Sequence, residues 1–280
     1  MNHWLLIVAL LCGTVVAAQP IFSARVDGIR VDVLVTDSSR RPLRGLTGAD
    51  FTIRDNGVPQ EIDIVSFGES SLNVGLSFDL SESVDGEPLA RLQAASRALT
   101  NALQPADRLA LVTFDRVVTL RCALSSNRSC AIEALAAARP EGETALVDGV
   151  FAGMMVGESD AGRSLLMVFS DGLDTASFLG ANRVLDMGRR SDVVVYPITS
   201  KGARPQFLDE LASLTGGQLH EIDKSDDLSA TFRSILDEFR HRYLVTYTPK
   251  NVPKDGWHKL EVRVNRSGAR VKARPGYQGG

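Results

Sequence analysis

The sequence has little of several residue types on which common functions depend. Only four of its 280 residues are histidines and three are cysteines. His220, His241 and His258 lack the spacing of metal ligands, so we expect them to be ordinary surface or partly buried residues, without catalytic or zinc-binding roles. Gly-x-Ser-x-Gly elbows, Walker loops and His-Glu-x-x-His helices are absent. This absence argues against the common hydrolase and nucleotide-dependent mechanisms, and we expect no small-molecule cofactor.

An excess of charge of either sign is also lacking. The 31 basic and 34 acidic residues give a formal charge of -3 and are mixed along the chain. Such a composition provides no positive field for phosphate backbones, so we expect no nucleic-acid partner. The hydrophobic fraction of 44% and the charged fraction of 23% are close to those of folded globular proteins. The length suits one domain of ordinary size with a small companion.

The longest uncharged run lies at the amino terminus. Leu5–Ala18 has the length of a signal-peptide apolar region and is too short to cross a bilayer. We predict a signal peptide over residues 1–18, cleaved before Gln19, and therefore a secreted or periplasmic protein. An uncleaved membrane anchor formed by the same residues is the alternative.

The cysteines fit this prediction of export. Removal of Cys12 with the signal peptide leaves Cys122 and Cys130, which are close in sequence. We expect them to form a disulfide, because disulfides persist outside the cytoplasm. Two unpaired thiols are the alternative.

Residues 22–70 have the pattern of β-strands. Arg30–Thr36 alternates valines with mostly polar residues, as a half-buried strand does. Phe51–Arg54 and Glu61–Val65 flank Asp55–Gly57, whose Asn-Gly pair tolerates positive φ. We therefore expect these two flanking segments to form a β-hairpin.

From about residue 71 to residue 240, short apolar runs alternate with helical patterns. The runs are typical of strands buried in a parallel sheet, and they are Val74–Asp79, Leu109–Phe114, Leu165–Phe169 and Val193–Tyr196. An apolar stripe over Leu228–Phe239 predicts a last helix. The alternation predicts an α/β fold with a doubly wound, mostly parallel sheet between two layers of helices. Val117–Leu120 follows the preceding strand too closely for a crossover, so it should pair antiparallel at an edge.

Residues 241–277 return to strand patterns. The strands expected are Tyr243–Tyr247, Lys259–Val264 and Ala269–Lys272, the last two separated by the turn-like Ser267-Gly268. Neither this segment nor residues 22–70 is large, and a stable sheet needs three or more strands with a shared face. We therefore expect both ends to join in one small β-rich domain into which the α/β unit is inserted.

Candidate ligands follow the first strand of the α/β unit. Asp79-Leu80-Ser81-Glu82-Ser83 comes at the carboxyl edge of the sheet, where open α/β sheets bind ligands. Alternate residues of an extended loop face the same way, so Asp79, Ser81 and Ser83 should present their oxygens to one point. Such hard oxygen ligands suit Mg²⁺, Mn²⁺ or Ca²⁺ better than zinc or copper.

Two later loops supply further oxygens at the same edge, from Thr144 and from Asp171. An ion that needs about six oxygens would keep room for an outside ligand. Hydroxyls leave the ion part of its positive charge, so we expect a protein partner to provide an acidic side chain. The structural alternative is that these residues are helix caps and turn residues. Asp148 and Asp174 are nearby in sequence, and we expect them to be solvated or to support the ligands.

The pattern resembles the von Willebrand factor A-type family, whose metal-ion-dependent adhesion site has Asp-x-Ser-x-Ser, a Thr on a second loop and an Asp on a third. The matching residues are Asp79, Ser81, Ser83, Thr144 and Asp171. More narrowly, the mature chain is similar to exported von Willebrand-A-related proteins of acidobacteria, through Val31–Asp37, Gly45-Leu46, Asp50-Phe51, Phe169–Thr175 and Ala273–Tyr277. The resemblance implies the fold of that family and a divalent cation, with Mg²⁺ as the first choice.

The sequence departs from the family motif at Glu82, where glycine is usual. This side chain is an extra ligand, a regulatory plug or an outward-facing group, and we favour the last. We predict a non-enzymatic, metal-dependent protein-binding module. The alternatives are a metal-assisted hydrolase, for which Glu82 and Glu143 are the nearby carboxylates, and a structural envelope protein with a degenerate site. Asp79→Ala should abolish cation binding and leave the fold largely intact, because an exposed loop carboxylate contributes little to the core.

Overall fold

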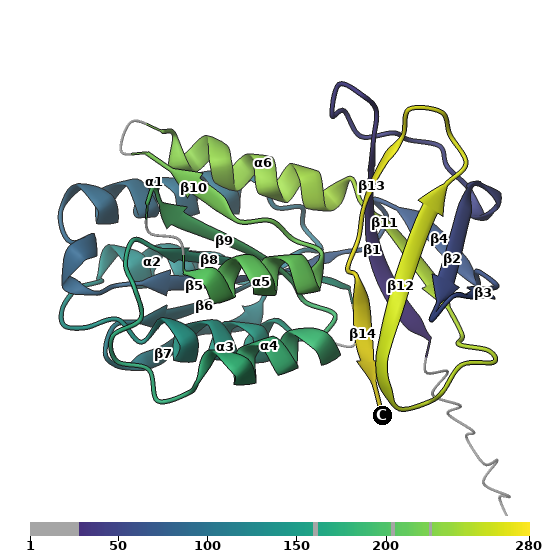
Figure 1. Ribbon diagram of the computed structural model, residues 1–280. Helices are drawn as coiled ribbons and strands as arrows, with labels where there is room; N and C mark the ends of the chain where they lie inside the picture. The colour runs from purple at the N-terminus through teal and green to yellow at the C-terminus, as the bar shows by residue number, and fades with distance from the viewer. Residues whose placement is uncertain (1–27, 159–161, 203–204, 224–225) are drawn as a thin grey trace, which may run out of the picture.

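The computed structural model describes residues 28–158, 162–202, 205–223 and 226–280. The predicted signal peptide, residues 1–18, lies outside the described residues. An α/β domain with helices on both faces of its sheet lies beside a smaller unit of β-strands (Figure 1). Within the described ranges, no helix is long and apolar enough to cross a membrane.

The α/β domain is built on a six-stranded sheet of order β10-β9-β8-β5-β6-β7. Its strands are β5 (Leu72–Asp79), β6 (Arg108–Phe114), β7 (Val118–Ser125), β8 (Arg163–Ser170), β9 (Val194–Ser200) and β10 (His220–Ile222). The central strands β5 and β8 are buried along their whole length, as expected of parallel strands covered on both faces. β7 pairs antiparallel with β6 at one edge, which confirms the prediction for this segment.

Helices cover both faces of this sheet. One core cluster joins one face to α1 (Glu87–Ala102), α2 (Ser129–Ala136) and α6 (Leu228–Arg240). A second cluster joins the other face to α3 (Leu146–Gly157), α4 (Ala181–Arg190) and α5 (Gln206–Thr215). Figure 1 shows α6 along the top of the domain and α3 and α4 along the bottom. The predicted doubly wound, mostly parallel architecture is confirmed.

Both ends of the chain contribute to a β-sandwich of two four-stranded sheets. One sheet has the order β13-β1-β11-β4 and the other β14-β12-β2-β3. The strands are β1 (Ile29–Thr36), β2 (Phe51–Asp55), β3 (Val58–Gln60), β4 (Ile64–Phe67), β11 (Tyr243–Tyr247), β12 (Gly256–Val264), β13 (Arg270–Lys272) and β14 (Gly276–Gly279), with a 3-10 turn η1 at Gly48–Asp50. β1 pairs with β11 and β2 pairs with β12, so strands from before and after the α/β domain share each sheet. The α/β unit is inserted in this β-rich domain, as expected.

One expectation about strand pairing is wrong. The partner of β2 across the turn is β3, whereas the whole segment Glu61–Val65 lies outside that hairpin. The turn is tight because Asn56 and Gly57 have φ of 47° and 82°, which places Val58 opposite Asp55. β4 pairs with β11 in the other sheet. Similarly, the turn at Ser267-Gly268 carries the chain from β12 in one sheet to β13 in the other.

Buried arginines join the sandwich to the α/β domain. At the start of β8, Arg163 is 2% exposed and lies 2.6 Å from a carboxylate oxygen of Asp32 in β1. Arg274, between β13 and β14, donates to the carbonyl of Ser191 after α4 at 3.0 Å. Both contacts lie at the end of the sheet where its parallel strands begin. The sandwich therefore leaves the carboxyl edge of the sheet uncovered (Figure 1).

Candidate metal centre

The candidate ligands gather at this uncovered edge because of the register of two central strands. β5 and β8 are parallel neighbours, with Phe78 opposite Phe169. Asp79 is the last residue of β5, and Asp171 directly follows the last residue of β8. Adjacent strands are about 5 Å apart, so the two carboxylates are brought near each other by the sheet itself.

Asp79 is completely buried, with 0% of its surface exposed. The premise that it lies on an exposed loop is therefore wrong, because β5 continues to this residue and Leu80 still donates to the carbonyl of Phe114 at 2.7 Å. Its Oδ1 accepts the backbone N–H of Ser81 at 2.8 Å, and its Oδ2 accepts the hydroxyl of Ser170 at 2.6 Å. These two donors fix the orientation of the carboxylate.

Hydrogen bonds connect three of the other predicted ligands. The hydroxyl oxygens of Ser81 and Ser83 are 3.1 Å apart, and the Ser83 hydroxyl donates to Asp171 Oδ1 at 2.7 Å. The loop is extended only as far as Ser81, since the 3-10 turn η2 (Glu82–Val84) follows. Within this turn the side chain of Glu82 is exposed, as is that of Ser83.

Thr144 approaches the same edge from the loop before α3. It is 6% exposed, its carbonyl accepts the N–H of Thr175 at 2.9 Å, and its own N–H donates to the Thr175 hydroxyl at 3.0 Å. A Cβ atom added to Gly172 would lie 3.9 Å from the Thr144 hydroxyl oxygen. The Thr144 hydroxyl is therefore next to the loop that carries Asp171.

Close packing of α3 on the sheet sets the position of Thr144. The Ser77 hydroxyl of β5 donates to the carbonyl of Gly149 in α3 at 2.7 Å. A Cβ atom at Gly149 would lie 2.2 Å from the ring of Phe114, so a side chain there would push the helix away. Glycine lets the helix lie close to β5 and β6, and the residues before its first turn reach the carboxyl edge.

Two carboxylates that we expected to be solvated or supporting have defined structural contacts. The carboxylate of Asp148 accepts the N–H groups of Phe178 and Leu179 at 2.8 and 2.9 Å. Asp174 Oδ1 accepts the N–H of Val147 at 3.2 Å. Together they attach the loop after Asp171 to the start of α3, so they fix the relative positions of two of the three loops that carry candidate ligands.

Ser170 and Thr175 have roles that were not predicted from the sequence. Ser170 holds Asp79 and Thr175 holds Thr144, as the distances above indicate. Both belong to the segment Phe169–Thr175, which we used only for its family resemblance and for Asp171. Their positions in the sequence could have indicated these roles, because hydroxyl residues that flank a candidate ligand can bind either a ligand carboxylate or the backbone of a neighbouring loop.

The electrostatics of the cluster suit a bound cation. Burial raises the pKa of Asp79, hydrogen bonds from Ser170 and Ser81 act in the opposite direction, and the negative charge of Asp171 raises it further. A cation between the two carboxylates would offset both the burial of charge and the repulsion. Among the described residues, no group of three or more His, Cys, Asp or Glu side chains is placed to hold a metal. The candidate set has mainly hydroxyls beside its carboxylates, and it fits a hard divalent ion.

Among the described residues, none of the contacts of this edge cluster given above involves a cysteine or a histidine. Cys122 of β7 and Cys130 of α2 are bonded through their sulfur atoms, with an S–S distance of 2.02 Å. His220 and His241 are partly buried, as expected. The expectation is wrong for His258, which is 1% exposed and has its Nδ1 2.8 Å from Asp55 Oδ1 in the sandwich.

No family model and no curated protein matches this chain. Solved structures do match it. A von Willebrand factor type A protein from Catenulispora acidiphila aligns over 89% of this chain and 73% of its own, with a TM-score of 0.56 and 11% identity. This chain has a von Willebrand A-type fold.

A second similar structure is proximal thread matrix protein 1 from the mussel byssus, described with a zinc occupied MIDAS motif. It aligns over 65% of this chain with a TM-score of 0.53 and 16% identity, and the match spans 48%, about half, of the mussel chain. At these identities the likeness is one of fold. The narrower resemblance to acidobacterial von Willebrand A proteins stays a prediction.

Proposed function

We propose that this protein is a metal-dependent protein-binding module of the von Willebrand A type. The ion, Mg²⁺ in the first place with Mn²⁺ or Ca²⁺ as substitutes, would be held by Asp79, Ser81, Ser83, Thr144 and Asp171. The observation that carries the proposal is the hydrogen-bonded series Ser81, Ser83 and Asp171 beside the buried carboxylate of Asp79. The mussel structure with a metal in the equivalent type of motif supports it by analogy of fold.

Each residue has a distinct part in the proposed site. Asp79 and Asp171 provide negative charge, and the hydroxyls of Ser81, Ser83 and Thr144 provide neutral oxygens. Ser170 keeps Asp79 oriented through its 2.6 Å hydrogen bond. When bound, the cation supplies positive charge and an open coordination position for an acidic side chain of a protein partner.

Exposed apolar side chains near the site favour binding over catalysis. Leu173 and Phe178, on the loop that follows Asp171, are 63% and 95% exposed. Large exposed apolar groups beside a polar site are typical of protein interaction surfaces. Glu82 and Glu143, the carboxylates available to a hydrolase, both have exposed side chains. We therefore propose no enzymatic role.

We also propose that the protein functions outside the cytoplasm, in the periplasm or as a secreted protein. The apolar run Leu5–Ala18 supports export. The bonded pair Cys122 and Cys130 supports an oxidising compartment.

Isothermal titration of Mg²⁺ into the metal-free mature protein tests the metal site. We expect saturable binding to one site, lost in Asp79→Asn and retained in Asp85→Asn, a control in which an exposed carboxylate near the site is removed. The titration is repeated with acetate present, because a partner carboxylate completes the proposed coordination. Absence of binding of Mg²⁺, Mn²⁺ and Ca²⁺, with and without acetate, would contradict the proposal.

A further inference from the structure

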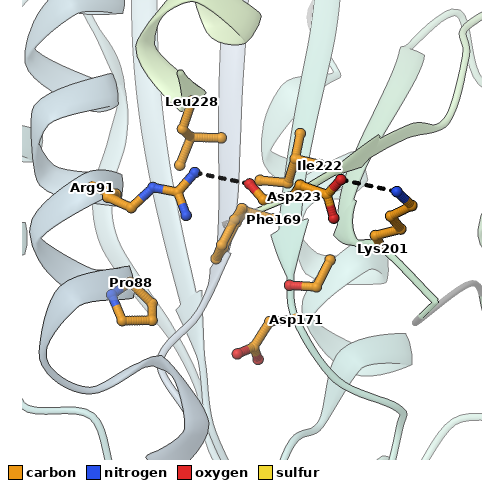
Figure 2. A pocket seen from close by; sticks show the side chains of 9 residues that line it. Pro88, Arg91, Phe169, Asp171, Lys201, Ile222, Asp223 and Leu228 are labelled. Atoms are coloured by element: carbon orange, nitrogen blue, oxygen red, sulfur yellow. Dashed lines mark hydrogen bonds and ion pairs between the residues drawn. The ribbon is translucent and has the colours of Figure 1, made fainter. Parts of the chain in front are cut away.

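A pocket in the α/β domain and a groove in the sandwich differ in whether their polar groups have partners. Figure 2 shows the pocket, of about 530 Å³, at the carboxyl ends of β8, β9 and β10. There Arg91 donates to the carbonyls of Asp223 and Asp226, and Lys201 lies 2.9 Å from the carboxylate of Asp223. The groove, by contrast, leaves groups of the backbone without partners.

This sandwich groove has a volume of about 470 Å³. It lies between Leu260–Arg263 of β12, Val271 of β13 and the connection Ala273–Pro275. β12 and β13 follow each other in the chain but belong to different sheets of the sandwich. The groove is therefore an opening between the two sheets.

The ladder between β12 and β14 ends at Pro275. Gly256–Lys259 pair with β14, and the next residue of β12, Leu260, donates its N–H to the Pro275 carbonyl at 2.9 Å. An antiparallel ladder normally returns a second hydrogen bond at such a pair. Proline has no N–H to donate, so the Leu260 carbonyl receives none from Pro275.

Beyond this point the same edge of β12 is free. The Lys259 carbonyl accepts the N–H of Asn56 on the β2 side, whereas Leu260 bonds on the β14 side. Because successive residues of a strand alternate in this way, the N–H and carbonyl of Val262 point to the same side as those of Leu260, toward the groove. Within the described part of the chain they have no hydrogen-bond partner. The groove thus offers one donor and two acceptors with the spacing of a ladder.

The floor of the groove consists of core side chains that remain partly exposed. Val262, Val271 and Ala273 pack against the sandwich core, and each is only half-buried. β13 pairs with β1 in the other sheet, so no strand of the described chain covers the core between β12 and β13. An apolar side chain opposite Val262 would remove this surface from water.

The outer rim of the groove is positively charged. Lys259 and Arg263 are 70% and 75% exposed and share the carboxylate of Glu261, at 3.4 and 3.5 Å. Arg270 of β13 is exposed and has no ion pair with any described residue. Three cations and one carboxylate leave an excess of two positive charges, which complements acidic side chains.

The other charged side chains near the groove do not cancel this excess. They balance one another in the pairs Arg274 with Asp192, Arg266 with Asp50, and Lys272 with Glu238, at 3.3, 3.0 and 3.8 Å.

We propose that the sandwich groove binds an extended segment of a partner protein, which adds to β12 as an antiparallel strand and carries an acidic side chain opposite Arg263. This inference goes beyond the proposed metal site and does not depend on it. In this register the residue opposite Val262 faces the core and should be apolar, while its two neighbours face the solvent. The added strand ends before Leu260, whose N–H is already bonded to Pro275.

The free backbone groups favour a strand over a helix or a small anion. A helix bonds its own N–H and carbonyl groups internally, so it has none for Val262. An anion could accept the Val262 N–H, but it would leave the carbonyls of Leu260 and Val262 without donors and the floor uncovered. A strand supplies donors, an acceptor and an apolar side chain together, as in other cases of strand addition to a free edge.

Synthetic peptides test this inference. The first probe is acetyl-Thr-Val-Glu-Val-Thr-amide, in which the second valine is to lie opposite Val262 and the glutamate opposite Arg263. NMR titration of the isotope-labelled mature protein follows the amide signals of Val262 and Val271. An analogue with lysine for glutamate should bind about fivefold more weakly, because an unfavourable cross-strand charge pair replaces a favourable one.

N-methylated peptides test the hydrogen bonds. A methyl group on the nitrogen of the second valine removes the donor to the Val262 carbonyl and should weaken binding about tenfold. A methyl group on the nitrogen of the glutamate is the matched control. That N–H points away from β12, so the affinity should stay within about twofold.

A charge reversal locates the acidic preference. Arg263→Glu should bind the lysine peptide more tightly than the glutamate peptide. The control is Lys250→Glu, which reverses a sandwich cation that likewise pairs with an exposed carboxylate, Glu61 at 2.8 Å. It should keep the preference for glutamate. Lys250 and Arg263 are 58% and 75% exposed, so neither substitution removes core packing.

Four outcomes would overturn the proposal. They are no shift of Val262 and Val271 with the glutamate peptide, equal affinity for the glutamate and lysine peptides, equal affinity for the two N-methylated peptides, and binding that requires Mg²⁺, which would assign the peptide to the metal centre. Concentration-dependent shifts of the two signals without peptide would assign the groove to a second copy of this chain and also overturn it. We expect the glutamate peptide to bind equally in Mg²⁺, in chelator and to Asp79→Asn, so failure of the metal site would leave this inference standing.

Discussion

Two aspartates with no exposed surface, Asp55 in the sandwich and Asp79 in the α/β domain, have opposite surroundings. The carboxylate of Asp55 accepts the hydroxyls of Tyr247 and Tyr277 at 2.9 and 2.8 Å, and its other oxygen lies 2.8 Å from His258 Nδ1. These partners come from β11, β12 and β14, so one carboxylate connects both sheets of the sandwich. Both oxygens of Asp55 therefore have side-chain partners within the sandwich.

Asp79 has two donors, the Ser170 hydroxyl and the Ser81 N–H, and a second carboxylate, Asp171, nearby. Its pKa is raised, by burial first and by the charge of Asp171 in addition. Because Asp55 and Asp79 are equally buried, burial alone does not distinguish a structural acid from a candidate ligand. The distinction lies in how many donors surround the carboxylate and in whether a second acid adjoins it.

The largest effect on stability is expected when the Asp55 carboxylate is removed from the sandwich. Asp55→Ala leaves His258 and two tyrosine hydroxyls buried without their acceptor, so we expect the free energy of unfolding to fall by about 3–5 kcal/mol. Urea unfolding monitored by circular dichroism measures it. A loss below about 1 kcal/mol would show that Asp55 is not the centre of this network. Mg²⁺ affinity of the folded fraction should be unchanged.

A smaller effect on stability is expected when one hydrogen-bond donor to Asp55 is removed and Asp55 itself is kept. Tyr277→Phe deletes the hydroxyl that lies 2.8 Å from Asp55 and leaves the stacked ring against His258 in place. We expect a loss of about 1.5–3 kcal/mol in the free energy of unfolding, the usual range for one hydrogen bond to a charged group. An unchanged urea midpoint would mean that Tyr247 and His258 alone satisfy the carboxylate.

The smallest effect on stability, and the largest on binding, is expected at Asp79. In chelator at pH 7, the free energy of unfolding of Asp79→Asn should be within about 1 kcal/mol of the wild-type value or slightly higher, because the substitution removes a buried charge. The pKa of Asp79 is raised above its ordinary value of 3.8, so ionisation disfavours the folded state. Relative to Asp79→Asn, the wild type should therefore lose stability as the pH rises from about 4 through the raised pKa.

Added Mg²⁺ should reverse that loss in the wild type only, because a ligand that binds the folded state alone raises its stability. Parallel urea titrations of both proteins at pH 4.5 and pH 7, with and without Mg²⁺, measure the difference. A pH-independent difference in chelator would contradict the assigned electrostatics of Asp79, while leaving the hydrogen bonds unaffected.

Sequence patterns predicted the α/β domain well because its strands are buried on both faces and its helices have one apolar stripe. The order of Asp79, Thr144 and Asp171 after successive elements also placed candidate ligands at one edge without knowledge of the contacts. Both results depend on local periodicity and on the rule that parallel strands end at the same edge.

Strand partners in the sandwich could not be predicted in this way. The pairing of β3 with β2 follows from the local turn at Asn56 and Gly57, whereas β4 has no local feature that assigns it to β11, because Val65 pairs with Val245, 180 residues later in the chain. The burial of His258 depends equally on Asp55, which is 203 positions away. Asp79 seemed exposed because a motif does not reveal how far its strand extends.

The position of the sandwich determines which end of the molecule is accessible when the protein is attached to a surface. Gly280 directly follows β14 in the sandwich, and the candidate metal centre lies at the opposite end of the α/β sheet (Figure 1). The molecule therefore has two poles, one where the described chain begins and ends and one where the candidate ligands are. A bead or sensor surface attached through Gly280 leaves the second pole facing the solution, so the proposed binding at the candidate ligands can be measured without obstruction by the support.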